Sequence, residues 1–393
     1  MMKRDFAKLD RLINRFVDTK SIPGCGISIM QGDEIIYEGY AGYADIESGR
    51  PVDRSSMFRQ ASTTKLFTYA IMGMLYEEGE FLFSDPIGDY IPEWKNTMRY
   101  AVAPNGEVKA VPLEKPMTIR DAVAMMCGMP YCMMPAVDPV TPTLAAMSRQ
   151  IAKLCEKGVP TLLEEARIMA DAPVMFEPGT HWQYGFGSEI TGALVEVFTG
   201  KALREVFKER LIEPLELEHT DTYVTDANRS FLVTHYGKGK DGSFTPASVE
   251  LDRWMDKNYM PVHGRPNLMS TPNDFAAFMQ MLANGGTYKG RKLMGEGTVN
   301  MLHVSQLDEV SHKDYDNDYL AGYGYGLGFR TLETQKYGHN GRLGCFGWTG
   351  GAGTWMEADP VDKLSISYMH NMSPNEELYH HHRIRAVAYG CLL

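Results

Sequence analysis

The sequence predicts a protein of two lobes: an α/β lobe built from both ends of the chain, and a mostly helical lobe inserted between them. Strand-like segments flank the turn signal Gln31-Gly32-Asp33, and others follow after about residue 320. Helical patterns with Pro and Gly punctuation fill most of the region from about 80 to 285. We therefore expect an α/β lobe from residues 1–64 and 286–393, a helical lobe from 65–285, and an active site in the cleft between them.

Each element has a local signal. An apolar helix is expected to start close to Ser62, and Gly79 stops it. Thr118 opens another helix, Gly200 closes one, and Thr271-Pro272 caps a further one. The expected strands cover 26–30, 34–40, 323–329, 353–357 and 364–370, and the other helices cover 143–155, 161–172, 188–199 and 376–389.

Composition narrows the classes of partner. The chain has 393 residues, more than one compact core usually serves, with 44% hydrophobic and 23% charged residues. The net charge of −11 argues against nucleic acid or an anionic membrane as a main partner. Charges interrupt the first ten residues, and no apolar run reaches the roughly 18 residues that span a bilayer. We expect a cytoplasmic protein whose six cysteines are mostly buried free thiols.

Ser62 and Lys65 form an S-x-x-K motif. On a helix these side chains lie on one face, with roughly 5–6 Å between their Cβ atoms. A hydroxyl is a poor nucleophile until a base takes its proton, and a desolvated lysine can be that base. About one or two such matches arise by chance in a chain this long, so a solvated lysine is the alternative. The buried helix that follows favours the catalytic interpretation.

The surroundings of this motif resemble the superfamily of serine β-lactamases, DD-peptidases and family VIII carboxylesterases. The resemblance runs from about residue 20 to 370 and is carried by the segments 39–45, 58–65, 85–93, 176–180 and 325–328. It implies a β-lactamase/transpeptidase-like fold with an antiparallel sheet. It also implies that Tyr184, in the place of the family's Y-x-N tyrosine, helps Lys65 to move the proton of Ser62. The alternative for Tyr184 is a packed aromatic side chain.

Two departures from the family pattern bear on the substrate. Phe186 stands where the family's asparagine would be, and Trp348 replaces the basic residue of the K-T-G triplet, here Trp348-Thr349-Gly350. The resemblance implies an oxyanion hole from the backbone N–H groups of Ser62 and Gly351, although a glycine-rich turn is the alternative. An aromatic wall suits an apolar ester better than a penicillin or a peptide C-terminus. Asn267 and His339 are further candidates for lining the pocket, with a structural turn histidine as the alternative for His339.

We therefore predict a serine hydrolase that forms an acyl-enzyme at Ser62, as a carboxylesterase or transesterase acting on small apolar acyl esters. The rivals are a β-lactamase or D-amino-acid peptidase, and a catalytically silent homologue that binds an acyl or peptide ligand. The partner would be a small ester, amide or lactam, with no cofactor. No zinc-type spacing occurs, and His380, His381 and His382 are consecutive, so they point different ways on a helix. We expect these three histidines to form a partly exposed helix face.

Overall fold

The computed structural model describes residues 5–131, 141–155, 160–247, 255 and 267–392. Its centre is an eight-stranded sheet in which every neighbouring pair is antiparallel. The strand order is β12 (Tyr323–Tyr325), β13 (Arg330–Leu332), β14 (Phe346–Gly350), β15 (Thr354–Asp359), β16 (Leu364–Met369), β1 (Gly24–Gln31), β2 (Glu34–Asp45) and β3 (Arg50–Pro51). The late strand β16 lies beside the early strand β1, so the predicted sheet built from both ends of the chain is confirmed.

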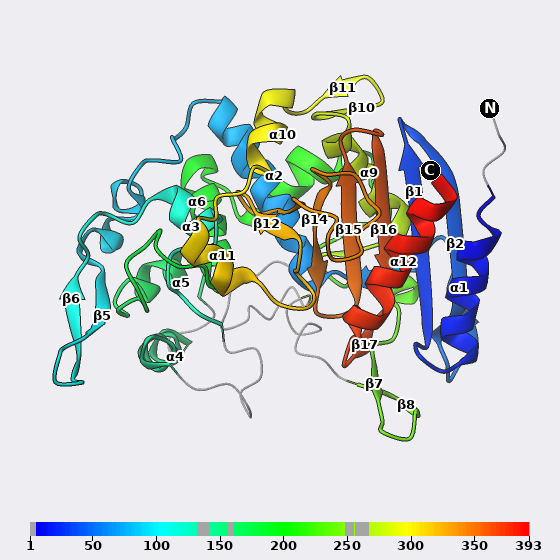
Figure 1. Ribbon diagram of the computed structural model, residues 1–393, viewed down its shortest axis with the longest axis horizontal. Helices are drawn as coiled ribbons and strands as arrows, with labels where there is room; N and C mark the ends of the chain where they lie inside the picture. The colour runs from blue at the N-terminus through cyan, green and yellow to red at the C-terminus, as the bar shows by residue number, and fades with distance from the viewer. Residues whose placement is uncertain (1–4, 132–140, 156–159, 248–254, 256–266, 393) are drawn as a thin grey trace.

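Helices cover both faces of this sheet (Figure 1). Helix α12 (Glu377–Leu392) lies in front of the sheet beside α1 (Ala7–Asp18), and α9 (Pro272–Ala283) packs behind it on β1, β15 and β16. Strands β15 and β16 are buried along their whole length because of this double cover. In α1, the residues that face the core recur at the spacing of an amphipathic helix: Leu9, Leu12, Ile13 and Phe16.

The inserted region is mostly helical. Helix α2 (Lys65–Glu77) is buried from Lys65 to Leu75 and packs against α6 (Gly187–Thr199), α7 (Leu203–Phe207) and α10 (Glu296–Leu302). Capping boxes begin α3 (Ile119–Val123) and α5 (Leu162–Met169), at Thr118 and Thr161. Helix α4 (Pro142–Cys155) also lies in this region, and α11 (Glu309–Tyr315) follows it in the sequence.

The sequence did not predict several short strands, which lie both inside and outside this region. The hairpin of β5 (Met98–Val102) and β6 (Val108–Pro112) projects at the far end of the helical part (Figure 1). Two further pairs of short strands are β4 (Phe58–Arg59) with β9 (Met269–Ser270), and β10 (Thr287–Tyr288) with β11 (Arg291–Lys292). In a small three-stranded sheet, β7 (Tyr236–Lys238) lies between β17 (Met372–Ser373) and β8 (Phe244–Pro246). The lobe boundary at residue 285 stays a prediction, and α9, just before it, packs on the sheet.

The prediction of a partly exposed histidine face on the last helix holds only for His382, which is half-buried. His380 and His381 are fully buried: His380 packs against Phe16 of α1, and His381 packs against Trp355 of β15. Cys25, Cys127 and Cys345 are buried free thiols.

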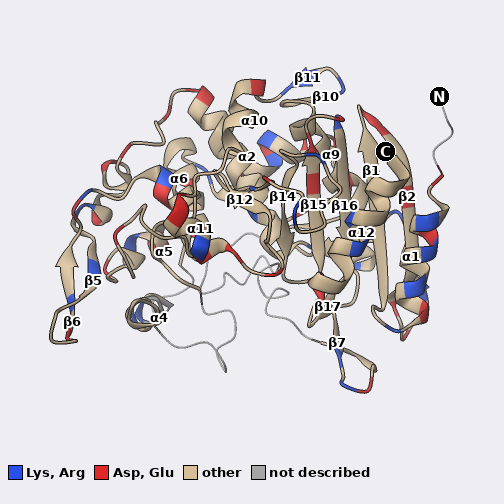
Figure 2. Ribbon diagram, viewed as in Figure 1, with Lys and Arg blue, Asp and Glu red and all other residues tan. Residues whose placement is uncertain are grey.

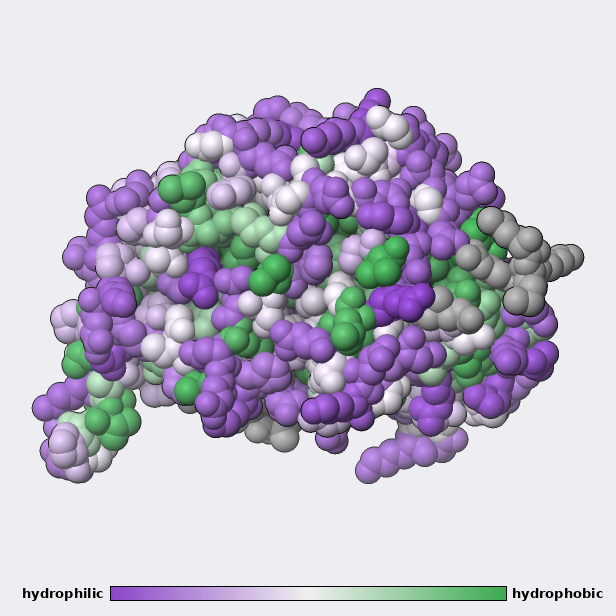
Figure 3. Space-filling model, turned by 45° about the horizontal axis from the view of Figure 1, so that its top comes forward, coloured by the Kyte–Doolittle hydropathy of each residue, from purple (hydrophilic) through white to green (hydrophobic). Residues whose placement is uncertain are grey.

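The surface is mixed in character. Lys, Arg, Asp and Glu alternate along the outer side of α1 and are scattered over the remaining elements (Figure 2). The face shown in Figure 3 is mainly hydrophilic, with separate hydrophobic patches. Within the described part of the chain, no helix has the length and apolarity needed to cross a bilayer.

Candidate active site

The serine and lysine of the S-x-x-K motif are in contact. Ser62 lies in a short 3-10 helix, Ala61–Thr64, that leads directly into α2, and Lys65 is the first residue of α2. The Lys65 Nζ lies 3.2 Å from the Ser62 Oγ, within hydrogen-bonding distance. Lys65 is 7% exposed, whereas Ser62 is half-buried. The pair thus combines an accessible hydroxyl with an amine largely removed from water.

A strained turn precedes the serine, and Asn267 holds it. Ala61 has a φ of 49°, in the left-handed region that non-glycine residues seldom occupy. Its backbone N–H donates to the Oδ1 of Asn267 at 2.9 Å, and the N–H of Gln60 donates to the carbonyl of Leu268 at 2.8 Å. Asn267 was predicted to line the pocket; the structure places it, 2% exposed, against the backbone of the nucleophile turn.

The ring of Tyr184 stands beside Lys65, and Trp348 packs on that ring. The Nζ of Lys65 lies 5.2 Å from the ring centroid of Tyr184, and Tyr184 stacks on Trp348 with 5.6 Å between ring centroids. The indole Nε1 of Trp348 lies 3.4 Å from the Tyr184 hydroxyl oxygen. Phe186 is buried at the start of α6. The structure therefore brings Ser62, Lys65, Tyr184 and Trp348 together.

Sequence reasoning missed Tyr131. Its ring centroid lies 5.5 Å from the Lys65 Nζ, and its ring also makes a T-shaped contact with Phe186. Its hydroxyl lies 2.6 Å from both carboxylate oxygens of Glu189, which is 2% exposed. The sequence offered one indirect signal, because Glu189 lies in a largely apolar helix and a buried carboxylate needs polar partners, but nothing local identifies Tyr131 as that partner.

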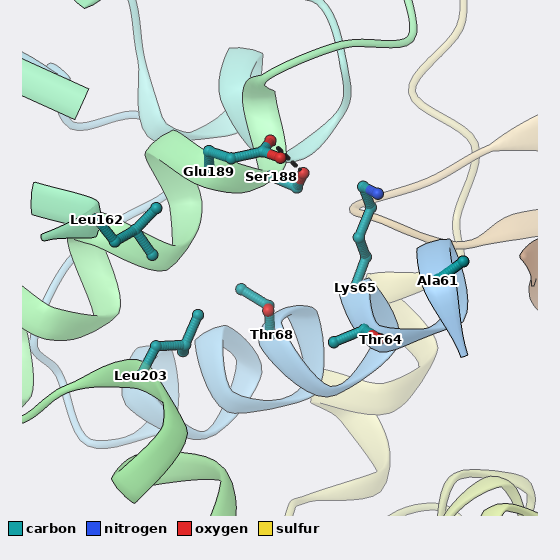
Figure 4. A pocket seen from close by; sticks show the side chains of 8 residues that line it. All are labelled: Ala61, Thr64, Lys65, Thr68, Leu162, Ser188, Glu189 and Leu203. Carbon is teal, nitrogen blue, oxygen red and sulfur yellow. Dashed lines mark hydrogen bonds between the residues drawn. The ribbon is translucent and has the colours of Figure 1, made fainter. Parts of the chain in front are cut away.

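A small cavity separates Lys65 from Glu189 (Figure 4). Figure 4 shows Lys65 and Thr68 rising from α2 on one side and the hydrogen-bonded pair of Ser188 and Glu189 on the other. The cavity volume is about 30 Å³. A polar-lined cavity of this size has room for water. Its lining is Ala61, Thr64, Lys65, Thr68, Leu162, Ser188, Glu189 and Leu203.

Strand β14 reaches the nucleophile turn through Gly350. A Cβ on Gly350 would lie 2.2 Å from the carbonyl oxygen of Gln60, so only glycine permits this approach. The same carbonyl accepts hydrogen bonds from the hydroxyls of Thr63 at 2.8 Å and Thr354 at 3.1 Å. Gly351, next along the chain, is exposed and faces open space. This arrangement places the predicted oxyanion-hole strand beside the predicted nucleophile.

The other two predicted residues point elsewhere. Thr349 directs its hydroxyl toward Glu377 of α12, with 3.1 Å between Oγ1 and Oε2. The Nε2 of His339 lies 2.7 Å from the carbonyl oxygen of Ala321, and its ring packs against Tyr323. The described contacts of His339 do not include Ser62, Lys65 or Tyr184.

Comparison with known proteins agrees with this geometry. The chain matches the family model described as Beta-lactamase over residues 9–389. Protein Rv1367c of Mycobacterium tuberculosis is 24% identical over 377 residues, covering 92% of this chain and 89% of that protein. Esterase EstB of Burkholderia gladioli is 27% identical over 232 residues, covering 59% and 55%. The solved structure of EstCE1, a hydrolase with promiscuous acyltransferase activity, has a TM-score of 0.80 at 21% identity and covers 98% of both chains. The chain therefore belongs to the beta-lactamase family, has its fold and is a serine hydrolase.

Proposed function

We propose that the protein is a carboxylesterase or transesterase that forms an acyl-enzyme at Ser62 on small apolar esters. The observation that carries this proposal is the 3.2 Å contact between the Ser62 Oγ and the Nζ of the nearly buried Lys65. A buried lysine next to a half-exposed serine is the arrangement in which an amine can accept a hydroxyl proton.

The proposed reaction has two halves. Lys65 takes the proton of Ser62 while the Oγ attacks the ester carbonyl, and the backbone N–H groups of Ser62 and Gly351 stabilise the oxyanion. The C–O bond to the alcohol then breaks, and the proton passes through Lys65 and Tyr184 to the departing alkoxide. Water, or a second alcohol, attacks the acyl-enzyme by the reverse path and releases an acid or a new ester.

The preference for apolar esters rests on the walls of the site. Phe186 and Trp348 are apolar where the family pattern has an asparagine and a basic residue. Trp348 packs on Tyr184 and, at 5.2 Å between ring centroids, on Tyr325. Such a wall offers an acyl chain a surface for hydrophobic contact and offers a carboxylate no cation. The similarity to EstB, a relative named as an esterase, supports the same choice.

The first test is hydrolysis of 4-nitrophenyl butyrate by the wild type, Ser62→Ala and Lys65→Met. We expect turnover by the wild type and a loss of several orders of magnitude in kcat in both variants. Ser28→Ala is the matched control, because Ser28 is a buried serine of the sheet strand β1. Equal activity of Ser62→Ala and the wild type would remove Ser62 as the nucleophile. Much faster turnover of a chromogenic cephalosporin than of simple esters would replace the esterase assignment by a β-lactamase.

A further inference from the structure

A carboxylate lies against the back of the strand that borders the proposed oxyanion hole. Trp348 and Gly350 face the nucleophile turn, so the alternation of β14 places Thr349 on the opposite face, toward the start of α12. The Thr349 Oγ1 lies 3.1 Å from the Glu377 Oε2 and 3.0 Å from the Thr354 carbonyl oxygen. Glu377 is half-buried, as is Thr349.

Within the described part of the chain, one oxygen of this carboxylate remains available. The hydroxyl of Thr349 and the Nδ2 of Asn375, at 3.3 Å, both approach Oε2. Neither hydrogen bond uses Oε1, and a carboxylate oxygen has two acceptor positions. Glu377 can therefore accept a further donor without breaking its contact with β14.

Two of the ionisable groups that neighbour this carboxylate are Arg330, whose charge acts on it, and His381. Arg330 of β13 is 2% exposed, and its guanidinium lies 5.1 Å and 4.9 Å from the ring centroids of Tyr319 and Tyr323. His381 of α12, 3.4 Å from the Thr349 Oγ1 through its Nδ1, has its pKa held well below the ordinary value, mainly by burial. Burial raises the pKa of Glu377, and the charge of Arg330 opposes that rise.

As far as the structure describes the chain, one edge of β14 is unpaired beside the candidate active site, near this carboxylate. Along Trp348–Gly350 the strand pairs with β15, whereas its pairing with β13 involves only Phe346 and Gly347. The other edge of Trp348, Thr349 and Gly350 therefore has no strand partner among the described residues, and a ligand can lie along it. A substrate held at Gly351 and extending along this edge passes the end of the strand that Glu377 supports.

We propose that Glu377 sets the charge preference of the site, so that it rejects substrates with a carboxylate beyond the scissile carbonyl and favours an ammonium group there. This inference rests on the proposed function and deepens it. At an effective dielectric constant of about 20, one charge roughly 12 Å away changes the relative rates by about tenfold. The ligand class is a small ester with a neutral or, preferably, cationic end.

The test compares Glu377→Gln with the wild type on matched esters. 4-Nitrophenyl butyrate and 4-nitrophenyl hemisuccinate differ by an anionic end on the acyl group. Butyrylcholine and 3,3-dimethylbutyl butyrate differ by a cation on the alcohol. In Glu377→Gln we expect the kcat/KM ratio of hemisuccinate to butyrate to rise, or the ratio of choline ester to dimethylbutyl ester to fall, by about tenfold. A ratio cancels any change that affects all substrates equally, so a purely structural role of Glu377 would leave both ratios unchanged.

Glu376→Gln is the matched control, because it removes the same charge one residue away. Glu376 lies 2.8 Å from the Nζ of Lys238, a separate contact from that of Thr349. Equal ratios in the wild type and Glu377→Gln, or equal shifts in both variants, would overturn the inference and leave the esterase proposal standing. The rates at which neutral and carboxylate-bearing phosphonates label Ser62 give a second measure of the charge preference, and this measure does not require turnover. Absence of any labelling at Ser62 would overturn both proposals.

Discussion

The Oδ1 of Asn267 accepts a hydrogen bond at 2.9 Å from the backbone N–H of Ala61, the residue before the candidate nucleophile. Ala61 has a positive φ, which costs of order 1 kcal/mol or more unless the surroundings enforce it. Asn267 is separated from Ala61 by more than two hundred residues in the sequence, so a distant segment sets the direction of the nucleophile turn.

Replacing Asn267 should therefore affect both folding and catalysis. Asn267→Ala leaves the Ala61 N–H without its partner, and we expect the free energy of unfolding to fall by about 1–3 kcal/mol. Because the turn loses its anchor, kcat/KM on 4-nitrophenyl butyrate should fall at least about tenfold. Asn284→Ala removes a side chain that bonds Gly32 and Asp33 instead, and it serves as the control. Equal losses of activity in the two variants, measured with urea titrations alongside, would show that Asn267 acts on stability alone.

The role of the Tyr184 hydroxyl can be tested separately from the role of its ring. Tyr184→Phe keeps the stacking on Trp348 and removes the proposed proton carrier, so kcat should fall by about 10²–10⁴. Trp348→Phe retains an aromatic wall and removes the indole N–H near that hydroxyl, and we expect a smaller loss, about tenfold. Tyr90→Phe, which removes a hydroxyl bonded to Asp85, is the control. A Tyr184→Phe enzyme as fast as the wild type in steady-state assays would exclude Tyr184 from proton transfer.

Substitution by alanine should affect the adjacent residues Gly350 and Gly351 differently. Gly350→Ala drives a methyl group against the carbonyl of Gln60, and we expect it to destabilise the fold by about 2 kcal/mol or more and to abolish activity. Gly351→Ala places its methyl in open space and keeps the N–H, so the free energy of unfolding should change by less than about 1 kcal/mol. Thermal unfolding and ester hydrolysis measure both. Equal destabilisation of the two variants would contradict the close contact between β14 and the turn.

The buried histidine His380 predicts a loss of stability in mild acid. Burial lowers its pKa from 6.5 to about 4, and it is fully buried with its Nε2 2.7 Å from the Ser21 Oγ. Between pH 6.5 and pH 4, His380 binds a proton in the unfolded chain but not in the folded chain. The contribution of His380 to the free energy of unfolding is therefore fully present above about pH 6.5 and is lost progressively toward pH 4. His380 alone should contribute a loss of about 2 kcal/mol by pH 5. Urea titrations at pH 7.5 and 5 should show a smaller decrease in His380→Gln, and an unchanged decrease would contradict the assignment.

Much of this architecture is visible in the sequence because local signals and the global fold agree. The cap at Thr271 and the glycine at the end of α6 each predict an element that the structure contains. The contact of Ser62 with Lys65 follows from their spacing alone. The hairpin of β5 and β6 was missed; its strands are short, and none of their residues is buried.

The parts that could not be predicted depend on long-range packing. No local pattern indicates that Tyr131 meets Lys65, or that Asn267 supports Ala61 instead of facing the substrate. The buried histidines of α12 were misjudged because a run of three polar residues ordinarily indicates a solvated face. In the structure, His380 and His381 find polar partners or aromatic rings between the helix and the sheet.

The pairing of β1 with β16 has a consequence for biosynthesis. The ribosome completes the strands β1 and β2 early, but the neighbour of β1 emerges more than three hundred residues later. During that interval, one backbone edge of a strongly apolar strand has no native partner, and such an edge can pair with the same strand of another nascent chain. The nucleophile turn likewise meets β14 only near the end of synthesis. Catalytic competence and protection from aggregation should therefore be acquired together, when the last quarter of the chain leaves the ribosome.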